Sequence, residues 1–139
     1  MAPEVVSRKL SQLETYLTEL RRHLGRPLPD SGDARYAVER LVQLVVEVLA
    51  DLVSHLLAEA GAPPAATYRD LFTAAGAAGL LPAELARRLA TAAALRNLIV
   101  HVYGRIDPAQ LAAALPDLVA DADAAARAFV RLGEPPEAS

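Results

Sequence analysis

The sequence predicts an all-α protein, an antiparallel four-helix bundle with one additional short helix, and three observations lead to this fold class. The 139-residue chain is 53% hydrophobic but only 4% aromatic, and it is rich in alanine and leucine, which have low helical cost. Its apolar residues recur at intervals of three and four, as on one face of a helix. Glycine and proline separate these segments, and no strand pattern occurs. We therefore expect one helical domain over residues 1–132 and a flexible tail over 133–139.

The first expected helix covers residues 3–24, and glycine and proline (Gly25 and Pro27) end it. Its apolar seam steps by four and three alternately and consists of Val6, Leu10, Leu13, Leu17, Leu20 and Leu24. The second helix covers residues 33–60 and stops before Gly61. Because this second helix is apolar over more than half its circumference, we expect it to lie centrally or to meet neighbours on two sides.

A short third helix is expected to follow, through Ala75. Thr67 has the character of an N-cap, with Asp70 three residues later. Gly76 and Gly79 are expected to break this helix.

Two further helices complete the bundle. The fourth covers residues 82–103, and the fifth covers residues 107–132. Asp107 and Pro108 are typical of an N-cap followed by the first helical residue. Pro116 is expected to kink or interrupt the fifth helix near its start, because proline removes a helical hydrogen bond.

The composition limits the classes of function. The net charge is −3, from 14 basic and 17 acidic residues, so any RNA contact has to come from a local arginine cluster or a basic partner. The absence of cysteine excludes disulfides and thiolate metal sites. No signal segment opens the chain, and no uncharged run reaches the roughly 18 residues of a membrane span. We expect a cytoplasmic protein without membrane association.

The fourth helix carries four polar side chains in one of the most hydrophobic stretches of the chain: Arg96, Asn97, His101 and Tyr103. On a helical wheel, Asn97 and His101 lie together, turned away from the expected core stripe, while Arg96 and Tyr103 share a flank. Arg96 and His101 point about 140° apart in an unbroken helix. The expected core stripe consists of Leu95, Leu98, Ile99 and Val102.

Each of these polar residues also has a purely structural interpretation. His101 is compatible with a surface or hydrogen-bonded residue, and it forms an i, i+4 pair with Asn97. Arg96 is compatible with a solvent-facing residue whose stem packs on the helix. Tyr103 is compatible with an anchor at the helix end. If the group is catalytic, Arg96 and His101 of one copy are poorly placed to act together, because they point in different directions. Two copies related by a two-fold axis would complete the site.

Taken together, the motif resembles the signature of HEPN-domain ribonucleases. The motif most resembles that of HepT-type toxins, which are paired with an MntA-type nucleotidyltransferase antitoxin. It consists of Arg96, four intervening residues, His101, one further residue and Tyr103, and Asn97 directly follows the arginine. The similarity extends to residues 67–89, and also to residues 35–57 with their Glu39, Arg40 and Gln43.

The resemblance implies a metal-independent endoribonuclease, the toxin of a type VII-like toxin–antitoxin system, with its active site composed at a homodimer interface. It implies that His101 serves as base or acid, that Arg96 contacts the phosphate, and that Asn97 orients His101 or binds a phosphate oxygen. It also implies that the nucleotidyltransferase adds AMP to Tyr103. RNA is the implied substrate, and no cofactor or metal is implied.

Other polar residues keep two interpretations. Four of them recur every three or four residues on the second helix: Arg40, Gln43, Glu47 and Asp51. In the first interpretation, all four form the solvated stripe of the helix. In the second, Arg40 or Glu47 supports the active site of the other protomer across the dimer. His23 and His55 have no visible partner in the sequence and are interpreted as structural.

A second function from a different class fits the same sequence. The protein would then be a non-catalytic dimeric helical module that docks a nucleotidyltransferase. The negative net charge favours docking, whereas the intact set of Arg96, Asn97, His101 and Tyr103 favours the ribonuclease, because docking alone does not need that combination.

Overall fold

The computed structural model describes residues 3–29, 32–102 and 106–133, and within these ranges it contains helices and no strand. The prediction of an all-α fold is confirmed, with four long helices and one short one. The helices are α1 (Pro3–Arg21), α2 (Asp33–Glu59), α3 (Tyr68–Ala77), α4 (Ala83–Val102) and α5 (Pro108–Gly133).

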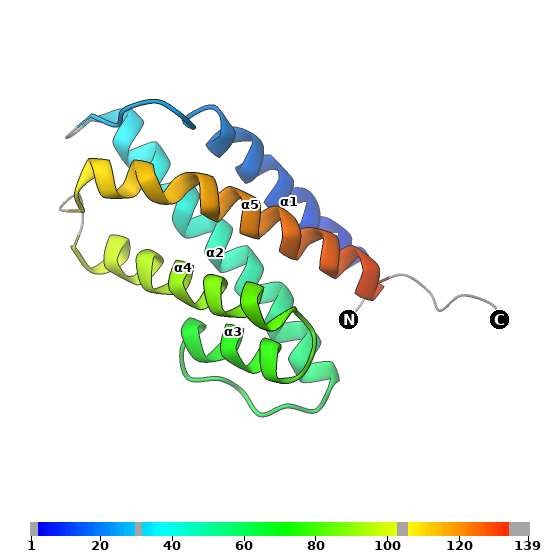
Figure 1. Ribbon diagram of the computed structural model, residues 1–139. Coiled ribbons are helices and arrows are strands. Elements are labelled where there is room, and N and C mark those ends of the chain that lie inside the picture. The colour runs from blue at the N-terminus through cyan, green and yellow to red at the C-terminus, as the bar shows by residue number, and fades with distance from the viewer. Residues whose placement is uncertain (1–2, 30–31, 103–105, 134–139) are drawn as a thin grey trace.

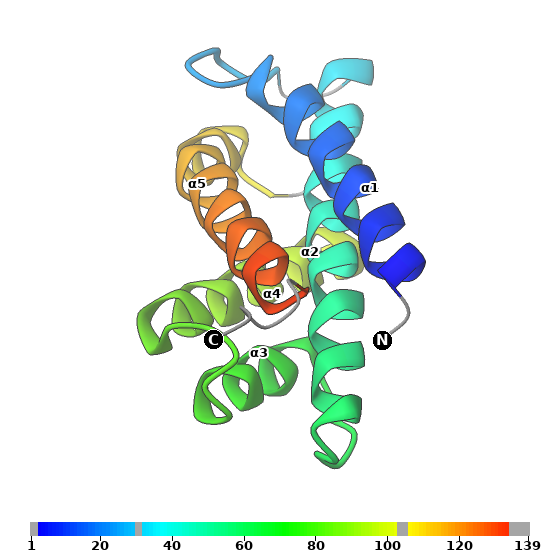
Figure 2. The ribbon, with the colours of Figure 1, turned by 90° about the vertical axis from the view of Figure 1, so that its right-hand side faces the viewer.

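The four long helices alternate in direction, so that α1, α2, α4 and α5 form an antiparallel bundle (Figure 1). The short helix α3 belongs to the connection between α2 and α4, and it packs mainly against α4. Helix α2 contacts all four other helices. Figure 2 shows it between α1 on one side and the α3, α4 and α5 group on the other. The expected central position of this helix is confirmed.

The core consists of mainly aliphatic side chains from all five helices, together with Phe72 and Phe129. Three leucines of the predicted α1 seam, Leu13, Leu17 and Leu20, are fully buried. Helix α2 is long and apolar enough to cross a membrane by length and composition, but half of the apolar window is buried inside the bundle. A core helix of a soluble protein passes the same test, so the apolar character of α2 is explained by its central position.

Two of the predicted helix boundaries are set by local capping contacts. The Thr67 hydroxyl accepts a hydrogen bond from the Asp70 amide at 3.0 Å and caps α3. The Asp107 carboxylate accepts a bond from the Ala109 amide at 3.0 Å, at the start of α5. Because both side chains satisfy amides that lack a partner in the first turn, the N-cap predictions are confirmed.

The glycine prediction for α3 is wrong at one position. Gly79 ends the helix with φ +75°, a conformation that favours glycine, but Gly76 lies inside α3. A Cβ atom at Gly76 would lie 2.7 Å from the Cβ of Ala86 on α4. Glycine is therefore used here for the close approach of two helices rather than for chain reversal.

Of the kink or interruption expected at Pro116, the interruption is absent, because α5 is one helix from Pro108 to Gly133. Pro116 itself is exposed, on the solvent side of α5. The neighbouring Leu115 and Leu118 are buried in the core. Tertiary packing of these side chains maintains the helix across the proline.

The core stripe expected near the end of α4 is confirmed only in part. Of its four members, Ile99 is buried and Leu95 is partly buried and packs against the core, whereas Leu98 is 40% exposed. Most of the buried face lies earlier in the helix, where α3 covers α4. The buried residues of α4 are Leu85, Ala86, Leu89, Ala90, Ala93 and Ile99.

Candidate active site

The last two turns of α4 bring Arg96, Asn97 and His101 to one pocket of about 440 Å³. The other walls come from α2 and from the segment leading into α3. Although Arg96 and His101 leave the helix in different directions, the long arginine side chain reaches the same pocket. His101 is exposed, and Asn97 is half-buried. Both side chains line the pocket between α2 and the segment leading into α3, and His101 is also open to solvent.

Three contacts hold the guanidinium of Arg96. Its Nη2 donates to Glu47 Oε1 at 3.3 Å, and its Nη1 donates to Asn97 Oδ1 at 3.0 Å. Its Cζ lies 4.7 Å from the centroid of the Tyr68 ring, the geometry of a cation–π contact. The side chain is only 18% exposed. Its Nε atom is buried and has no hydrogen-bond partner within the described ranges.

Glu47 supports the arginine from α2 of the same chain. Its side chain is 28% exposed, and the Oε1 atom that accepts from Arg96 also accepts from Gln43 Nε2 at 3.3 Å. A carboxylate held in this way fixes the cation by charge and by direction. Glu47 is therefore part of the site rather than of a solvated stripe. Arg40 is exposed and does not line the pocket.

Asn97 is engaged with the arginine rather than with the histidine. Its amide oxygen accepts from Arg96, and within the described part of the chain no hydrogen bond joins it to His101. The i, i+4 pair considered from the sequence is therefore not formed, and the imidazole stands at the pocket without a hydrogen bond from these ranges.

The fourth residue of the motif, Tyr103, lies outside the described residues. Just after it, the carbonyl of Ile106 accepts a hydrogen bond from Arg35 Nη2. Arg35 is almost fully buried, and its Nε lies 3.4 Å from Glu39 Oε2. This buried pair attaches the beginning of the α5 segment to α2. The i, i+4 spacing of Arg35 and Glu39 was its only sequence signal, and the pair was not predicted.

Two residues that contact side chains of the pocket were not singled out from the sequence. Tyr68 contacts Arg96 from the first position of α3. Lys9 on α1 pairs with Asp51 at 2.9 Å, and Asp51 lines the pocket. No local pattern connects these residues, because each pair joins two different helices, and Lys9 and Asp51, for example, are 42 residues apart.

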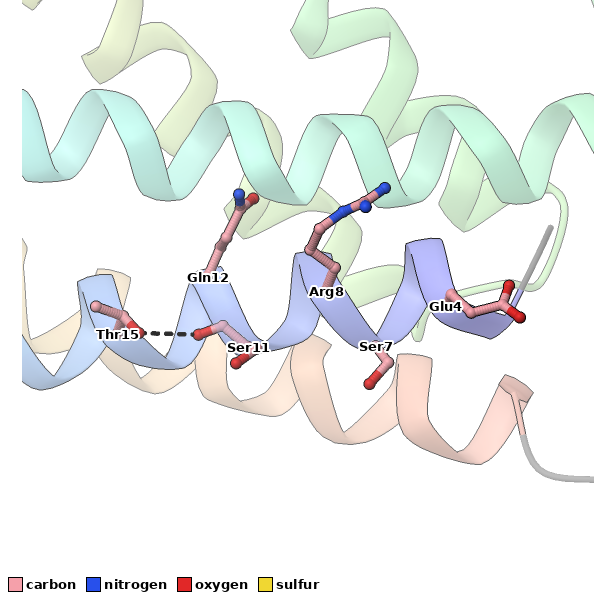
Figure 3. A pocket seen from close by; sticks show the side chains of 6 residues that line it. All are labelled: Glu4, Ser7, Arg8, Ser11, Gln12 and Thr15. Atoms are coloured by element: carbon pink, nitrogen blue, oxygen red, sulfur yellow. Dashed lines mark hydrogen bonds between the residues drawn. The ribbon is translucent and has the colours of Figure 1, made fainter.

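A second concavity, of about 700 Å³, lies on the outer side of α1. Figure 3 shows that its lining side chains all come from this one helix, and Thr15 Oγ1 donates to the Ser11 carbonyl. Since no other helix contributes a side chain, it has the character of a helix surface and contains none of the predicted site residues. The lining residues are Glu4, Ser7, Arg8, Ser11, Gln12 and Thr15.

The remaining histidines are separate from the site. His23 is half-buried, His55 is exposed, and neither lines the pocket. Over the described ranges there is no group of three or more histidine or carboxylate side chains placed to hold a metal ion.

Comparison with known proteins places this chain in a family. The model of the family described as ribonuclease HepT-like matches residues 8–129. The chain belongs to the HepT-like ribonuclease family. A tRNA nuclease HepT from Aphanizomenon flos-aquae (strain 2012/KM1/D3) is 30% identical over 112 residues, which cover 78% of this chain and 76% of that protein.

Solved structures give the same fold for this HepT-like chain. It is similar to a tri-AMPylated HEPN toxin of Shewanella oneidensis in complex with an MNT antitoxin, with a TM-score of 0.83, 17% identity, and coverage of 94% of this chain and 99% of that one. It is also similar to a mutant of the MntA–HepT toxin–antitoxin, with a TM-score of 0.82, 16% identity, and coverage of 91% and 98%. Because the sequence identities are this low, the similarity to these two structures shows only that the chain has the same fold.

Proposed function

We propose that this HepT-like protein is a metal-independent endoribonuclease and the toxin of a type VII-like toxin–antitoxin system. The observation that carries the proposal is the shared pocket of Arg96, Asn97 and His101, in which Glu47 and Tyr68 hold the arginine. Docking alone would not require an arginine held from three sides. The tRNA nuclease function of the cyanobacterial relative supports RNA as the substrate.

In the proposed reaction, His101 of one protomer takes the proton of the ribose 2′-OH, whose oxygen attacks the adjacent phosphorus. The bond to the 5′-oxygen breaks, and a protonated imidazole donates the proton that this leaving oxygen needs. Histidine serves in both roles because its ordinary pKa lies near neutrality. Arg96 contacts the phosphate oxygens on which negative charge accumulates, and its planar guanidinium fits two of them. The products are a cyclic phosphate and a free 5′-hydroxyl.

A homodimer would supply both histidines. The exposed side of α4 carries Leu98 and His101 one turn apart, and Leu98 borders a groove of about 520 Å³ between α4 and α5. An exposed leucine next to a largely apolar groove is typical of a surface that a partner covers. We propose that a second copy covers this surface, with its own His101 close to the first.

The proposed antitoxin is an MntA-type nucleotidyltransferase that adds AMP to Tyr103. The Shewanella oneidensis toxin of the same fold is described as tri-AMPylated and bound to an MNT antitoxin. AMP groups at Tyr103, two residues beyond His101 in the sequence, would add bulk and negative charge and would repel an RNA backbone. We place the protein in the cytoplasm, without cofactor or membrane.

The proposal is tested by expressing the protein in a bacterium and by measuring growth and RNA cleavage. We expect His101→Ala to abolish growth arrest and cleavage, while His55→Ala, at another exposed histidine outside the pocket, leaves both unchanged. Cleavage by the purified protein should persist in excess EDTA. Equal toxicity of wild type and His101→Ala would contradict a catalytic role and favour the docking module.

The dimer is tested separately by light scattering and by mixing. We expect the wild type at micromolar concentration to be dimeric and Leu98→Glu to be monomeric and inactive, because the new charge would be buried at the interface. Dimers containing one wild-type and one His101→Ala protomer should have lost most of their activity. A fully active monomer would contradict the composite site.

A further inference from the structure

We propose that Tyr68, the first residue of α3, is a positioning residue for Arg96. It would hold the guanidinium in the orientation that binds the RNA phosphate. This inference rests on the proposed ribonuclease function, which requires Arg96 as the phosphate contact. It identifies a role for α3, the helix that is additional to the four-helix bundle.

The contacts of Arg96 divide into two kinds. Glu47 and Asn97 accept hydrogen bonds from the two terminal nitrogens, and together they direct the edge of the guanidinium. Tyr68 covers one face, with Arg96 Cζ 4.7 Å from its ring centroid. Two contacts at the edge leave the plane free to tilt about the line that joins them. The ring on the face limits that tilt.

An aromatic face has an advantage over a second carboxylate at this position. It attracts the cation through its quadrupole and accepts none of the in-plane hydrogen bonds, so it cancels no charge and occupies no N–H group. Each terminal nitrogen of Arg96 carries a second N–H group besides the one donated to Asn97 or Glu47, and the ring occupies neither of them. Donors oriented before the reaction cost no reorganisation when negative charge develops on the phosphate.

The local structure fixes the position of the Tyr68 ring, through the cap of α3 and through the packing of α3 on α4. Thr67 caps α3 and fixes the first turn that carries the ring. Further along α3, Gly76 permits the close approach to Ala86 of α4, the helix that carries Arg96. Tyr68 itself is half-buried and packs against the core. Its hydroxyl makes no hydrogen bond within the described part of the chain, so the ring rather than the hydroxyl is the functional group.

The first test compares three variants of the full-length protein in RNA cleavage at 25 °C: Tyr68→Leu, Tyr68→Phe and Tyr16→Leu. Tyr16 is a matched control, because it is also half-buried against the core but lies on α1, outside the pocket. We expect Tyr68→Leu to lower kcat about tenfold with a smaller change in KM. The free energy of a partly buried cation–π contact corresponds to about a tenfold change in rate. We expect Tyr68→Phe and Tyr16→Leu to retain the wild-type kcat, whatever their Tm.

The second test does not depend on activity. In the NMR spectrum, the Nε–H proton of Arg96, assigned with Arg96→Lys, should be shifted upfield by the current of the ring below it. The shift should persist in Tyr68→Phe and disappear in Tyr68→Leu. If Tyr68→Leu does not fold, the wild type and Tyr68→Phe still decide, because an unshifted Arg96 proton in either would overturn the proposal.

The outcomes separate this inference from the function on which it rests. If the wild type cleaves RNA and Tyr68→Leu cleaves it equally well, the positioning role is wrong and the ribonuclease stands. If the wild type cleaves no RNA, both fall. If Tyr68→Phe loses as much kcat as Tyr68→Leu, the hydroxyl is the active group and the proposal is overturned.

Discussion

Substituting Gly76 by alanine should force α3 away from α4. The new Cβ would lie 2.7 Å from the Cβ of Ala86, and ordinary van der Waals contact begins at 3.4 Å. The two atoms must therefore separate by about 0.7 Å. Ala86 is 2% exposed and has no side-chain torsion that could move its Cβ away. The helix backbones have to move instead.

The magnitude follows from two opposing terms. Overpacking of a core typically costs about 1–3 kcal/mol, while alanine in place of glycine inside a helix contributes about 1 kcal/mol of stability. We expect Gly76→Ala to lower the free energy of unfolding by about 1 kcal/mol. Urea denaturation measures it as a lower midpoint at unchanged slope.

A matched variant isolates the contact. Ala86→Gly removes the other Cβ, so the double variant Gly76→Ala/Ala86→Gly should be more stable than the sum of the two single changes predicts, by about 1 kcal/mol or more. If Gly76→Ala is as stable as the wild type or more stable, helix propensity outweighs packing, and the close approach of α3 and α4 is refuted.

Three further predictions concern single side chains. Glu47→Gln should lower the free energy of unfolding by about 1 kcal/mol in denaturant titrations, because Arg96 keeps its charge but loses the carboxylate; an unchanged value would mean that the pair adds nothing to the fold. Pro116→Ala should raise the stability by about 1–3 kcal/mol, since an exposed proline inside α5 withholds a helical hydrogen bond; a lower Tm would contradict this. Burial, opposed by the attraction of Arg88, raises the pKa of Asp121 above its usual range. The native state therefore binds the proton more readily than the unfolded state, and above this pKa the ionised carboxylate lowers the free energy of unfolding. Asp121→Asn should therefore be more stable than the wild type at pH 7, with the difference shrinking as the pH falls to the ordinary carboxyl range, and a constant difference across this range would exclude the titration as its cause.

Much of the fold was predictable because it depends on neighbours in sequence. The caps at Thr67 and Asp107 and the chain reversal at Gly25 are determined by side-chain and backbone preferences over three or four residues. The failures at Gly76 and Pro116 have the opposite origin. In both places the contacts of a whole helix with its neighbours outweigh the preference of one residue.

The candidate site was predictable only in part. The spacing of Arg96, Asn97 and His101 placed them on one helix, with Asn97 and His101 turned away from the core, but it also predicted that Leu98 faces inward. Leu98 instead lies at the surface, since α3 covers the first half of α4 and leaves Leu98 uncovered. Glu47 was considered as a support, but not as the partner of Arg96 in the same chain.

By itself, the sequence determined the helical class, the order of the helices, the capped starts of α3 and α5, and the motif on α4, because periodicity and capping act over a few residues. Only the tertiary structure decided that Arg96 is held by Glu47 of α2 and Tyr68 of α3. Those contacts depend on how three helices pack side by side, and the helical period specifies which face of each helix is apolar but not which neighbour covers it.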